Sequence, residues 1–330
     1  MTKEENKKEK TTSIKKLTRY REDKYVENND IEEEIKDNKK EDIEDIDELE
    51  EEKPKRRILL KLFLIIILIV LYSIYIEPKY LFKVNEYSIT TSKIDNEMNG
   101  LKIVELSDIH YGTSINKKQL ERVINKIIKI KPDIIVFTGD IFDKNINLSK
   151  NNINDIKNIF NKLKDIKYKY AIYGDNDYKY KDQYIELINN IGFTLLDNNN
   201  TLIYLDSNTP IEIIGINKYN NPDYNIITNS INEIDTSNLY KIVLDHEIDN
   251  IDNYLNYNPD LVLTAHSLGG LINIPFIGRI INTEGAKIYK EDYTKINNTE
   301  VYNSNGIGTS NLNVRFNNFP SINLYRIYKS

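Results

Sequence analysis

The sequence predicts a layered α/β domain with partly parallel sheets, preceded by one long apolar helix. From about Tyr87 onward, short apolar segments alternate with segments of helical periodicity, which is the rhythm of β–α–β units. Ahead of this region, residues 58–76 form an almost uninterrupted apolar run. As a helix this run spans about 28 Å, which matches the hydrocarbon core of a bilayer.

The composition excludes several kinds of functional site. The 330 residues contain 40% hydrophobic residues, enough for a packed core, and carry a net charge of −6, which gives no indication of nucleic-acid binding. The chain has no cysteine, so disulfides, zinc–thiolate sites and cysteine nucleophiles are excluded. Nothing in the composition indicates an oligomeric state.

Residues 1–57 are predicted to be a disordered charged tail because they lack large apolar clusters. Within them, residues 41–52 read EDIEDIDELEEE. A solvated acidic linker is the favoured interpretation. The alternative is a short helix that binds a partner, since Ile43, Ile46 and Leu49 recur at every third position.

The apolar run at 58–76 is predicted to be a single-pass membrane anchor. Only Lys61 interrupts it, close to its start, where a long side chain can reach the interface. A cleaved signal peptide would need a short basic start and a small-residue cleavage site, and neither is present. Lys and Arg crowd residues 53–57, so the positive-inside rule places the N-terminus in the cytoplasm and residues 77–330 outside.

Periodicity assigns the remaining elements. Strands are expected at 101–106, 133–137, 168–173, 202–205, 211–216, 241–244 and 261–264. Helices are expected at 117–130, 153–163 and 183–191, with a further candidate at 251–257.

Aspartate or histidine follows five of these strands. The residues are Asp108 and His110, Asp140, Asp175, His246, and His266, and they include all three histidines of the chain. Any one fragment alone is more often a turn or a structural residue. Together they indicate a metal site, because the carboxyl ends of strands converge on one edge of a sheet.

The chemistry of these side chains supports a metal site. Carboxylate and imidazole ligands suit divalent Mn, Fe, Zn and similar ions. Asp140 offers two oxygens and is able to bridge two ions. Two metals about 3.5–4 Å apart can clamp a phosphoryl group and generate hydroxide near neutral pH.

The ordered motifs resemble those of the calcineurin-like metallophosphoesterases over roughly residues 85–328. The motifs are SDIHYG at 107–112, GDIFD at 139–143, GDND at 174–177, LDHEID at 244–249, AHSLGG at 265–270, INIPFIG at 272–278 and NGIGTSNLNVRF at 305–316. They look most similar to a bacterial branch with an N-terminal anchor or signal, some members of which hydrolyse phosphodiester or pyrophosphate bonds.

The resemblance implies a two-sheet, four-layer α-β-β-α sandwich for residues 77–330. It also implies one or two bound divalent ions. By this resemblance, Asp108 and His110 would hold the first metal and Asp140 would bridge the two metals. Asp175, His246 and His266 would hold the second metal.

Three positions depart from the family pattern. Asp175 stands where the family has Asn, which adds one negative charge to the site. Asn176 stands where the family has the His thought to protonate the leaving group, a loss that typically costs about 10²–10⁴-fold in rate. Leu268 replaces a histidine ligand of the first metal, so water fills that position or the first metal is weak or absent.

Neighbouring acidic residues are expected to support the ligands. Asp143 and Asp249 are interpreted as structural or ligand-orienting groups in preference to ligands. Asp177 and Asp245 are further candidates for orienting ligands, and the sequence does not decide whether they do so.

The function expected is a membrane-anchored, metal-dependent phosphoesterase of weakened activity. It would act on phosphodiester or pyrophosphate bonds of a membrane- or cell-wall-linked substrate, with Asp140 and position 176 as the candidate catalytic residues. The alternative is a catalytically inactive surface domain that binds a metal or ligand. A third reading is an anchored adaptor whose acidic tail recruits a cytoplasmic partner.

Overall fold

The computed structural model describes residues 55–144, 146, 148–220, 222, 224–227, 236–310 and 312–330. The predicted tail up to residue 54 and its acidic run at 41–52 lie outside the described residues. By its internal contacts the chain divides into Met1–Ile69 and Val70–Ser330. The second unit carries both sheets and every candidate site residue.

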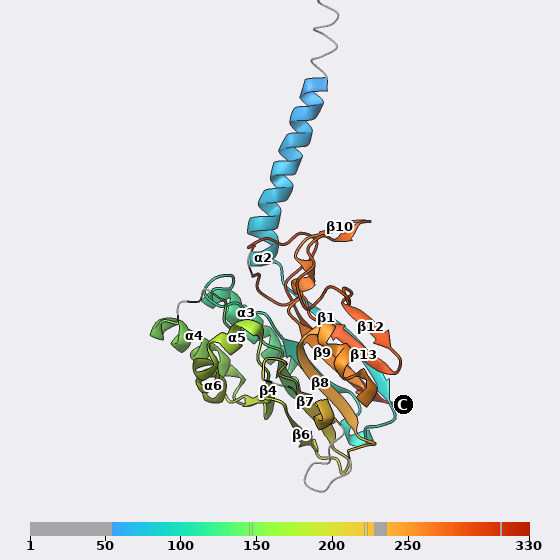
Figure 1. Cartoon of the computed structure of the whole chain (residues 1–330). Coiled ribbons are helices and arrows are strands. Elements are labelled where there is room, and N and C mark those ends of the chain that lie inside the picture. Colours follow the sequence, from blue (N-terminus) through green and yellow to red (C-terminus); the bar gives the residue numbers. More distant parts are fainter. Residues whose placement is uncertain are drawn as a thin grey trace, which may run out of the picture. The chain divides into compact units, whose positions relative to one another are not determined.

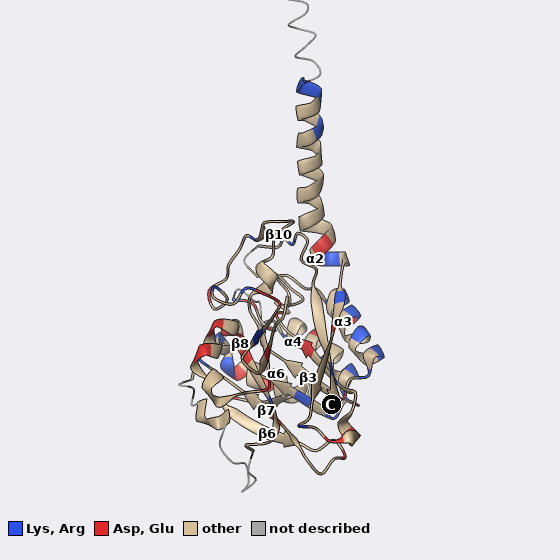
Figure 2. Ribbon diagram, turned by 90° about the vertical axis from the view of Figure 1, so that its right-hand side faces the viewer, with Lys and Arg blue, Asp and Glu red and all other residues tan. Residues whose placement is uncertain are grey.

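One helix in the described part of the chain, Lys55–Tyr80, is long and apolar enough to cross a membrane, with a mean hydropathy of 2.8. It begins three residues before the predicted apolar run and ends four residues after it. Most of its basic residues lie near its start, a long uncharged stretch follows, and Glu77 and Lys79 lie at its end (Figure 2). The helix closes with a π-helical turn, η1 (Tyr72–Ile76), and with α2 (Glu77–Tyr80).

Two six-stranded mixed sheets form the body of the second unit (Figure 1). The first has the order β1-β14-β2-β3-β4-β5, with bounds Lys83–Thr91, Ser321–Lys329, Leu101–Leu106, Ile134–Phe137, Tyr168–Ala171 and Thr194–Leu195. The second has the order β12-β13-β9-β8-β7-β6, with bounds Tyr293–Ile296, Thr299–Asn303, Leu261–Ala265, Tyr240–Glu247, Ile211–Gly215 and Asn199–Ile203. The strands that precede the candidate site, β2-β3-β4 and β8-β9, run parallel within each sheet.

The side chains of the first sheet alternate between two cores. Ile103 and Ile134 are paired across β2 and β3, and both enter a core shared with Ile242 and Leu263 of the second sheet. The next pair along the strands points to the opposite face, as the period of two in a strand requires. The two sheets therefore pack face to face around an apolar layer.

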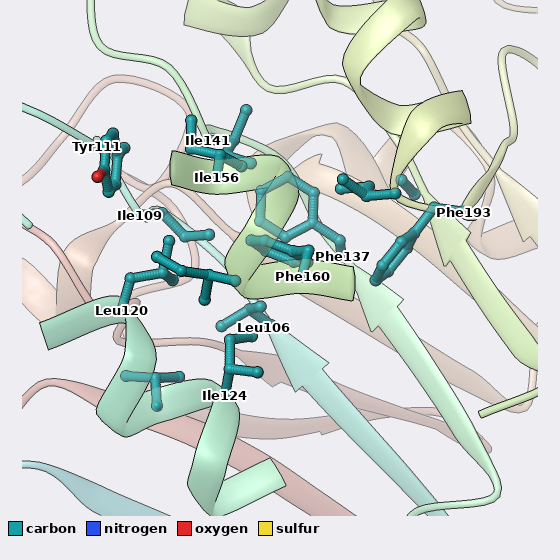
Figure 3. Packing of buried hydrophobic residues seen from close by; sticks show 14 of the residues in the cluster. Leu106, Ile109, Tyr111, Leu120, Ile124, Phe137, Ile141, Ile156, Phe160 and Phe193 are labelled. Atoms are coloured by element: carbon teal, nitrogen blue, oxygen red, sulfur yellow. The ribbon is translucent and has the colours of Figure 1, made fainter. Parts of the chain in front are cut away.

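Helices cover the other face of the first sheet. They are α3 (Lys117–Ile130), α4 (Lys150–Phe160) and α6 (Lys181–Asn190). Figure 3 shows Leu106 and Phe137 of the sheet packed with Leu120 of α3 and Phe160 of α4. An Asn116–Gln119 capping box begins α3 at the predicted position, because it satisfies backbone N–H groups of the first turn.

Short 3₁₀ helices lie against the outer face of the second sheet. They are η4 (Tyr224–Ile227), η5 (Ile248–Asn253) and η6 (Leu255–Tyr257), and their apolar residues pack with Val243 and Val262. The predicted two-sheet sandwich is confirmed. The helix proposed at 251–257 is replaced by the 3₁₀ turns η5 and η6.

A buried carboxyl, Glu105, lies in β2 three residues before Asp108. It accepts hydrogen bonds from the Tyr325 hydroxyl (2.7 Å), the Asn323 amide (2.9 Å) and the Thr138 hydroxyl (3.0 Å). Burial outweighs these bonds and raises the pKa of Glu105 to about 7. The folded protein thus holds this proton more tightly than the unfolded chain does. Its contribution to stability is complete below about pH 4.5 and is lost as the pH rises through about 7.

The substitution Glu105→Gln is expected to raise the free energy of unfolding at pH 8.5, by up to about 3 kcal/mol, while changing it little near pH 5. A glutamine keeps the acceptor facing Asn323 and donates to the Thr138 hydroxyl, without a charge to bury. Denaturant unfolding of the full chain in detergent at both pH values measures the difference. Glu186→Gln, on an exposed side chain of α6, is the control, and an equal gain in both variants would contradict the assignment.

Candidate metal centre

The strand ends bring all six predicted ligands together. They form two overlapping groups whose ligand atoms lie within 4.8 Å of one another: Asp140, Asp175, His246 and His266 in one group, and Asp108, His110 and Asp140 in the other. Four of them follow β2, β3 or β9, and Asp175 begins α5 (Asp175–Lys179) after β4. His246 lies within β8, which runs past the predicted end at 244 through a register shift between Leu244 and Glu247.

Asp140 belongs to both groups. Its Oδ2 lies 3.8 Å from His110 Nε2 and 3.6 Å from His246 Nε2. The same carboxylate accepts hydrogen bonds from the Asn176 amide at 2.6 Å and the Asn176 backbone N–H at 3.1 Å. This geometry suits a carboxylate that bridges two cations.

The group around Asp175 is the more complete of the two. Asp175 Oδ1 lies 3.7 Å from His246 Nε2 and 3.5 Å from His266 Nδ1, and the two histidine nitrogens are 3.1 Å apart. Burial raises the pKa of Asp175, but the hydrogen bonds and charges of His246 and His266 outweigh it and hold the pKa below its usual range. Two carboxylates and two imidazoles are a donor set that a divalent transition metal prefers.

The group around Asp108 contains an unsatisfied acceptor. Asp108 is 1% exposed, and its Oδ1 has no hydrogen-bond partner in the described part of the chain. Asp108 Oδ1 lies 4.0 Å from His110 Nε2, and His110 Nδ1 lies 3.5 Å from Asp143 Oδ2. Burial raises the pKa of Asp108. A buried carboxylate oxygen without a donor is costly, and a cation between Asp108, His110 and Asp140 would satisfy it. The residues present therefore fit a metal ion.

Four candidate ligands have left-handed backbone conformations. Their φ angles are 47° at Asp108, 47° at His110, 63° at Asp140 and 64° at His266. Residues other than glycine seldom adopt such angles, and the strain is held only where the surrounding structure imposes it. Backbone bonds impose it here, because the carbonyl of Asp140 accepts from the N–H groups of Ile109 (2.7 Å) and His110 (3.1 Å).

Two glycines allow the loops to approach. A Cβ on Gly139 would lie 2.5 Å from the backbone nitrogen of Gly174, and a Cβ on Gly174 would lie 2.0 Å from Asp140 Oδ1. A side chain at position 174 would therefore displace Asp140, and one at position 139 would displace the Gly174 backbone or His246. The glycine before each aspartate is a requirement of this close contact and not only a turn signal.

Asp177 orders the same loops. It is fully buried and accepts the backbone N–H groups of Asp140 (2.6 Å), Phe142 (3.0 Å) and Gly174 (3.2 Å). Asp177 therefore supports the backbone of the loops that carry Asp140 and Asp175, a role that the sequence left open. A second supporting group was missed in the sequence: the carbonyl of Thr138 lies 2.7 Å from His246 Nδ1 and leaves Nε2 directed to the site.

The two other acidic candidates support structure outside the ligand groups. Asp249 accepts backbone N–H groups of residues 287–289. Asp245 accepts the Asn250 amide at 2.6 Å and the backbone N–H of Glu247 at 3.3 Å, and so holds the turn that follows His246.

The departures from the family pattern have clear structural consequences. The Asn176 amide donates to Asp140 and, at 3.1 Å, to Asp175, so it orients two candidate ligands. Leu268 begins η7 (Leu268–Gly270) and is 4% exposed. The Asp108 group has three members where the Asp175 group has four, as the loss of a histidine at position 268 predicts.

Comparison with known proteins agrees with the motifs. The family described as calcineurin-like phosphoesterase matches residues 101–293. The uncharacterized metallophosphoesterase YkuE of Bacillus subtilis is 31% identical over 260 residues, 78% of this chain and 88% of that protein. Phosphodiesterase YaeI of Escherichia coli is 25% identical over 232 residues, 68% of this chain and 82% of that protein.

A further relative, a transmembrane protein with metallophosphoesterase domain from Danio rerio, is 26% identical over 129 residues, which cover 38% of this chain and 29% of that protein. The family match spans more than half of the chain, and the Bacillus relative aligns along most of its length. The chain therefore belongs to the calcineurin-like phosphoesterase family.

Proposed function

We propose that the chain is a membrane-anchored, metal-dependent phosphoesterase that hydrolyses phosphodiester or pyrophosphate bonds. The observation that supports this most directly is the Asp140 carboxylate, which is shared by two ligand groups. A site that only bound one structural ion would not need a second group with a buried, unsatisfied carboxylate at Asp108. A pair of divalent ions supplies charge stabilisation to a phosphoryl group and lowers the pKa of an attacking water.

The substrate approaches from the side of Asp175 and His266. The side chains of Asp175 and His266 are 31% and 15% exposed, whereas those of Asp108, Asp140 and His246 are at most 3% exposed. The buried ligands hold their geometry, and the two exposed ones line the entrance. The phosphoryl group would bind between this entrance and Asp140.

A polar pocket of about 360 Å³ shares Asp143 with the surroundings of His110. Its lining consists of Thr113, Ser114, Asp143, Lys144, Thr309, Ser310 and Asn313. Asp143 connects it to the site, since its carboxylate lies 3.5 Å from His110 Nδ1. Hydroxyl, amide and charged groups suit a hydrated polar substituent, so this pocket is the proposed place for the polar part of the substrate.

Asn176 limits the choice of substrate. An amide carries no acidic proton for the leaving group, so the rate depends on how well the leaving group departs without one. Substrates with leaving groups of low pKa, such as pyrophosphate-linked compounds and aryl diesters, are therefore expected to react best.

A second candidate function is a catalytically inactive surface domain that binds a metal or ligand. The observation that favours it is the joint loss of two functional groups: Asn176 is engaged with Asp140 and Asp175, and the Asp108 group lacks a fourth member. Metal uptake without hydrolysis would support this alternative.

The variant Asp140→Asn is expected to lose hydrolysis of an activated aryl phosphodiester with Mn²⁺ by about 10²-fold or more, because a neutral amide no longer balances two cations. Metal content per chain, measured by mass spectrometry, should fall in parallel. Asp155→Asn, a surface carboxylate on α4 that pairs with Lys117, is the matched control and should behave as wild type. Full activity in Asp140→Asn would refute the assignment.

Restoring the missing histidines should restore catalytic power. Leu268→His is expected to raise Mn²⁺ stoichiometry towards two ions per chain. Asn176→His is expected to speed hydrolysis of an alkyl diester, a poor leaving group, by about 10²-fold, with a much smaller gain on an aryl diester. Equal gains on both substrates would argue against a general-acid role at position 176. Circular dichroism establishes that each variant remains folded.

The domain is inferred to lie outside the cytoplasm, because basic residues crowd the N-terminal flank of the apolar helix. The natural absence of cysteine allows a direct test. With a membrane-impermeant maleimide on intact cells, Asn190→Cys should be labelled and Ser13→Cys should be labelled only after lysis. The reverse pattern would show the opposite orientation.

A further inference from the structure

A small antiparallel hairpin projects apolar side chains into solvent. It consists of β10 (Asn273–Ile274) and β11 (Gly278–Arg279), joined by a turn at residues 275–277. Phe276 is 109% exposed, relative to an extended reference, and Ile277 and Ile280 are 75% and 51% exposed. Phe276 also has a φ of 69°, an angle that places an aromatic side chain at the tip at some conformational cost.

This exposure is unusual for the domain. Among the large apolar side chains described between residues 81 and 330, Phe276 and Ile277 have the largest exposed fractions. A Cβ built on the adjacent Gly278 meets no atom within 4 Å, so the tip packs against little of the domain. Contiguous exposed apolar side chains usually mark a contact surface.

The base of the hairpin is tied to residues 315–318. The backbone N–H of Asn273 donates to the carbonyl of Phe316 at 2.9 Å, and the N–H of Phe316 donates to the carbonyl of Leu271 at 3.0 Å. Ile272 and Phe316 form a parallel bridge. These bonds set the hairpin against one side of the 315–318 segment.

The same segment holds the end of the apolar helix. The N–H of Arg315 donates to the carbonyl of Ser73 at 2.9 Å. The buried carboxylate of Glu77 accepts the N–H groups of Asn317 (2.9 Å) and Asn318 (2.5 Å). Residues 315–318 therefore bridge the hairpin to the helix end, and β10 and α2 lie at the same end of the domain in both views (Figures 1 and 2).

We propose that the hairpin tip, Phe276 and Ile277 together with Ile280, inserts into the membrane interface at the C-terminal end of the helix. This proposal rests on the proposed membrane anchor. The occupant is a lipid surface, because the chain that holds the hairpin also holds the residues at which the helix would leave the bilayer. Transfer of each such side chain out of water contributes about 1.5–3 kcal/mol, which suffices to orient a domain that is already tethered.

Insertion would also orient the candidate metal centre. His266, η7 and the strand pair β10–β11 follow β9 in direct succession. With the helix end and the hairpin both at the bilayer, the domain has two points of attachment instead of one. The entrance at His266 would then keep a constant angle to the lipid surface.

Single-cysteine labelling of the full chain tests this. Phe276→Cys carries an environment-sensitive nitrobenzoxadiazole dye in vesicles of phosphatidylcholine and phosphatidylglycerol. Tyr204→Cys is the matched control, because Tyr204 is 42% exposed and follows β6, which lies at the opposite end of the domain from β10 (Figure 1). Leu64→Cys, within the apolar run, reports on the anchor itself.

The dye at position 276 is expected to lose about half of its emission to a lipid with a nitroxide on its acyl chain and to resist aqueous iodide. The dye at position 204 should show the opposite behaviour. Labelling at Ile277→Cys should repeat the result for position 276, which guards against a local effect of one substitution.

Each other outcome is decisive. If position 64 is quenched by the nitroxide lipid but position 276 is as open to iodide as position 204, the anchor stands and the hairpin proposal is overturned. If position 64 is not quenched, the anchor itself fails. Shielding of position 276 from both quenchers would indicate a protein partner, such as a second copy of the chain, and would also overturn the proposal.

Discussion

The shared carboxylate of Asp140 is the contact on which the site depends. It lies between two sets of imidazoles and carboxylates, almost entirely removed from water. Buried like charges repel strongly unless a cation or proton compensates them. Two hydrogen bonds from Asn176 hold the Asp140 carboxylate in place, and the backbone N–H of Asp140 donates to Asp177.

The backbone conformation at the candidate ligands explains why glycines stand beside two of the aspartates. Left-handed backbone angles occur at Asp108, Asp140 and His266, whose ligand atoms belong to the two clustered groups. Gly139 and Gly174 leave room for the loops to touch, since a Cβ on either would collide. Hydrogen bonds between the loops after β2 and β3 hold these strained angles in place.

The C-terminal loop connects the site to the end of the apolar helix. The fully buried guanidinium of Arg315 donates to the carbonyls of Asn305 (2.7 Å) and Gly308 (2.5 Å). The N–H of Gly308 in turn donates to the carbonyl of Asp108 at 2.7 Å. Since the adjoining residues hold Glu77, one hydrogen-bonded segment reaches from a candidate metal ligand to the helix end.

The sequence by itself determined the α/β class, the apolar helix and the identity of the six clustered side chains, because periodicity and residue type at strand ends are local properties. The helix at Lys117–Ile130 matched its predicted bounds for the same reason. Strands β1, β13 and β14 were missed, since their pairing is decided by partners far along the chain.

Only the tertiary structure decided how those side chains meet. The register shift of β8 around His246, the support of the loops by Asp177 and the hydrogen bond of His246 Nδ1 to the Thr138 carbonyl all require contacts between distant segments. The sequence likewise did not predict that Phe276 is exposed. An apolar residue within a motif is indistinguishable from a core residue until the packing around it is known.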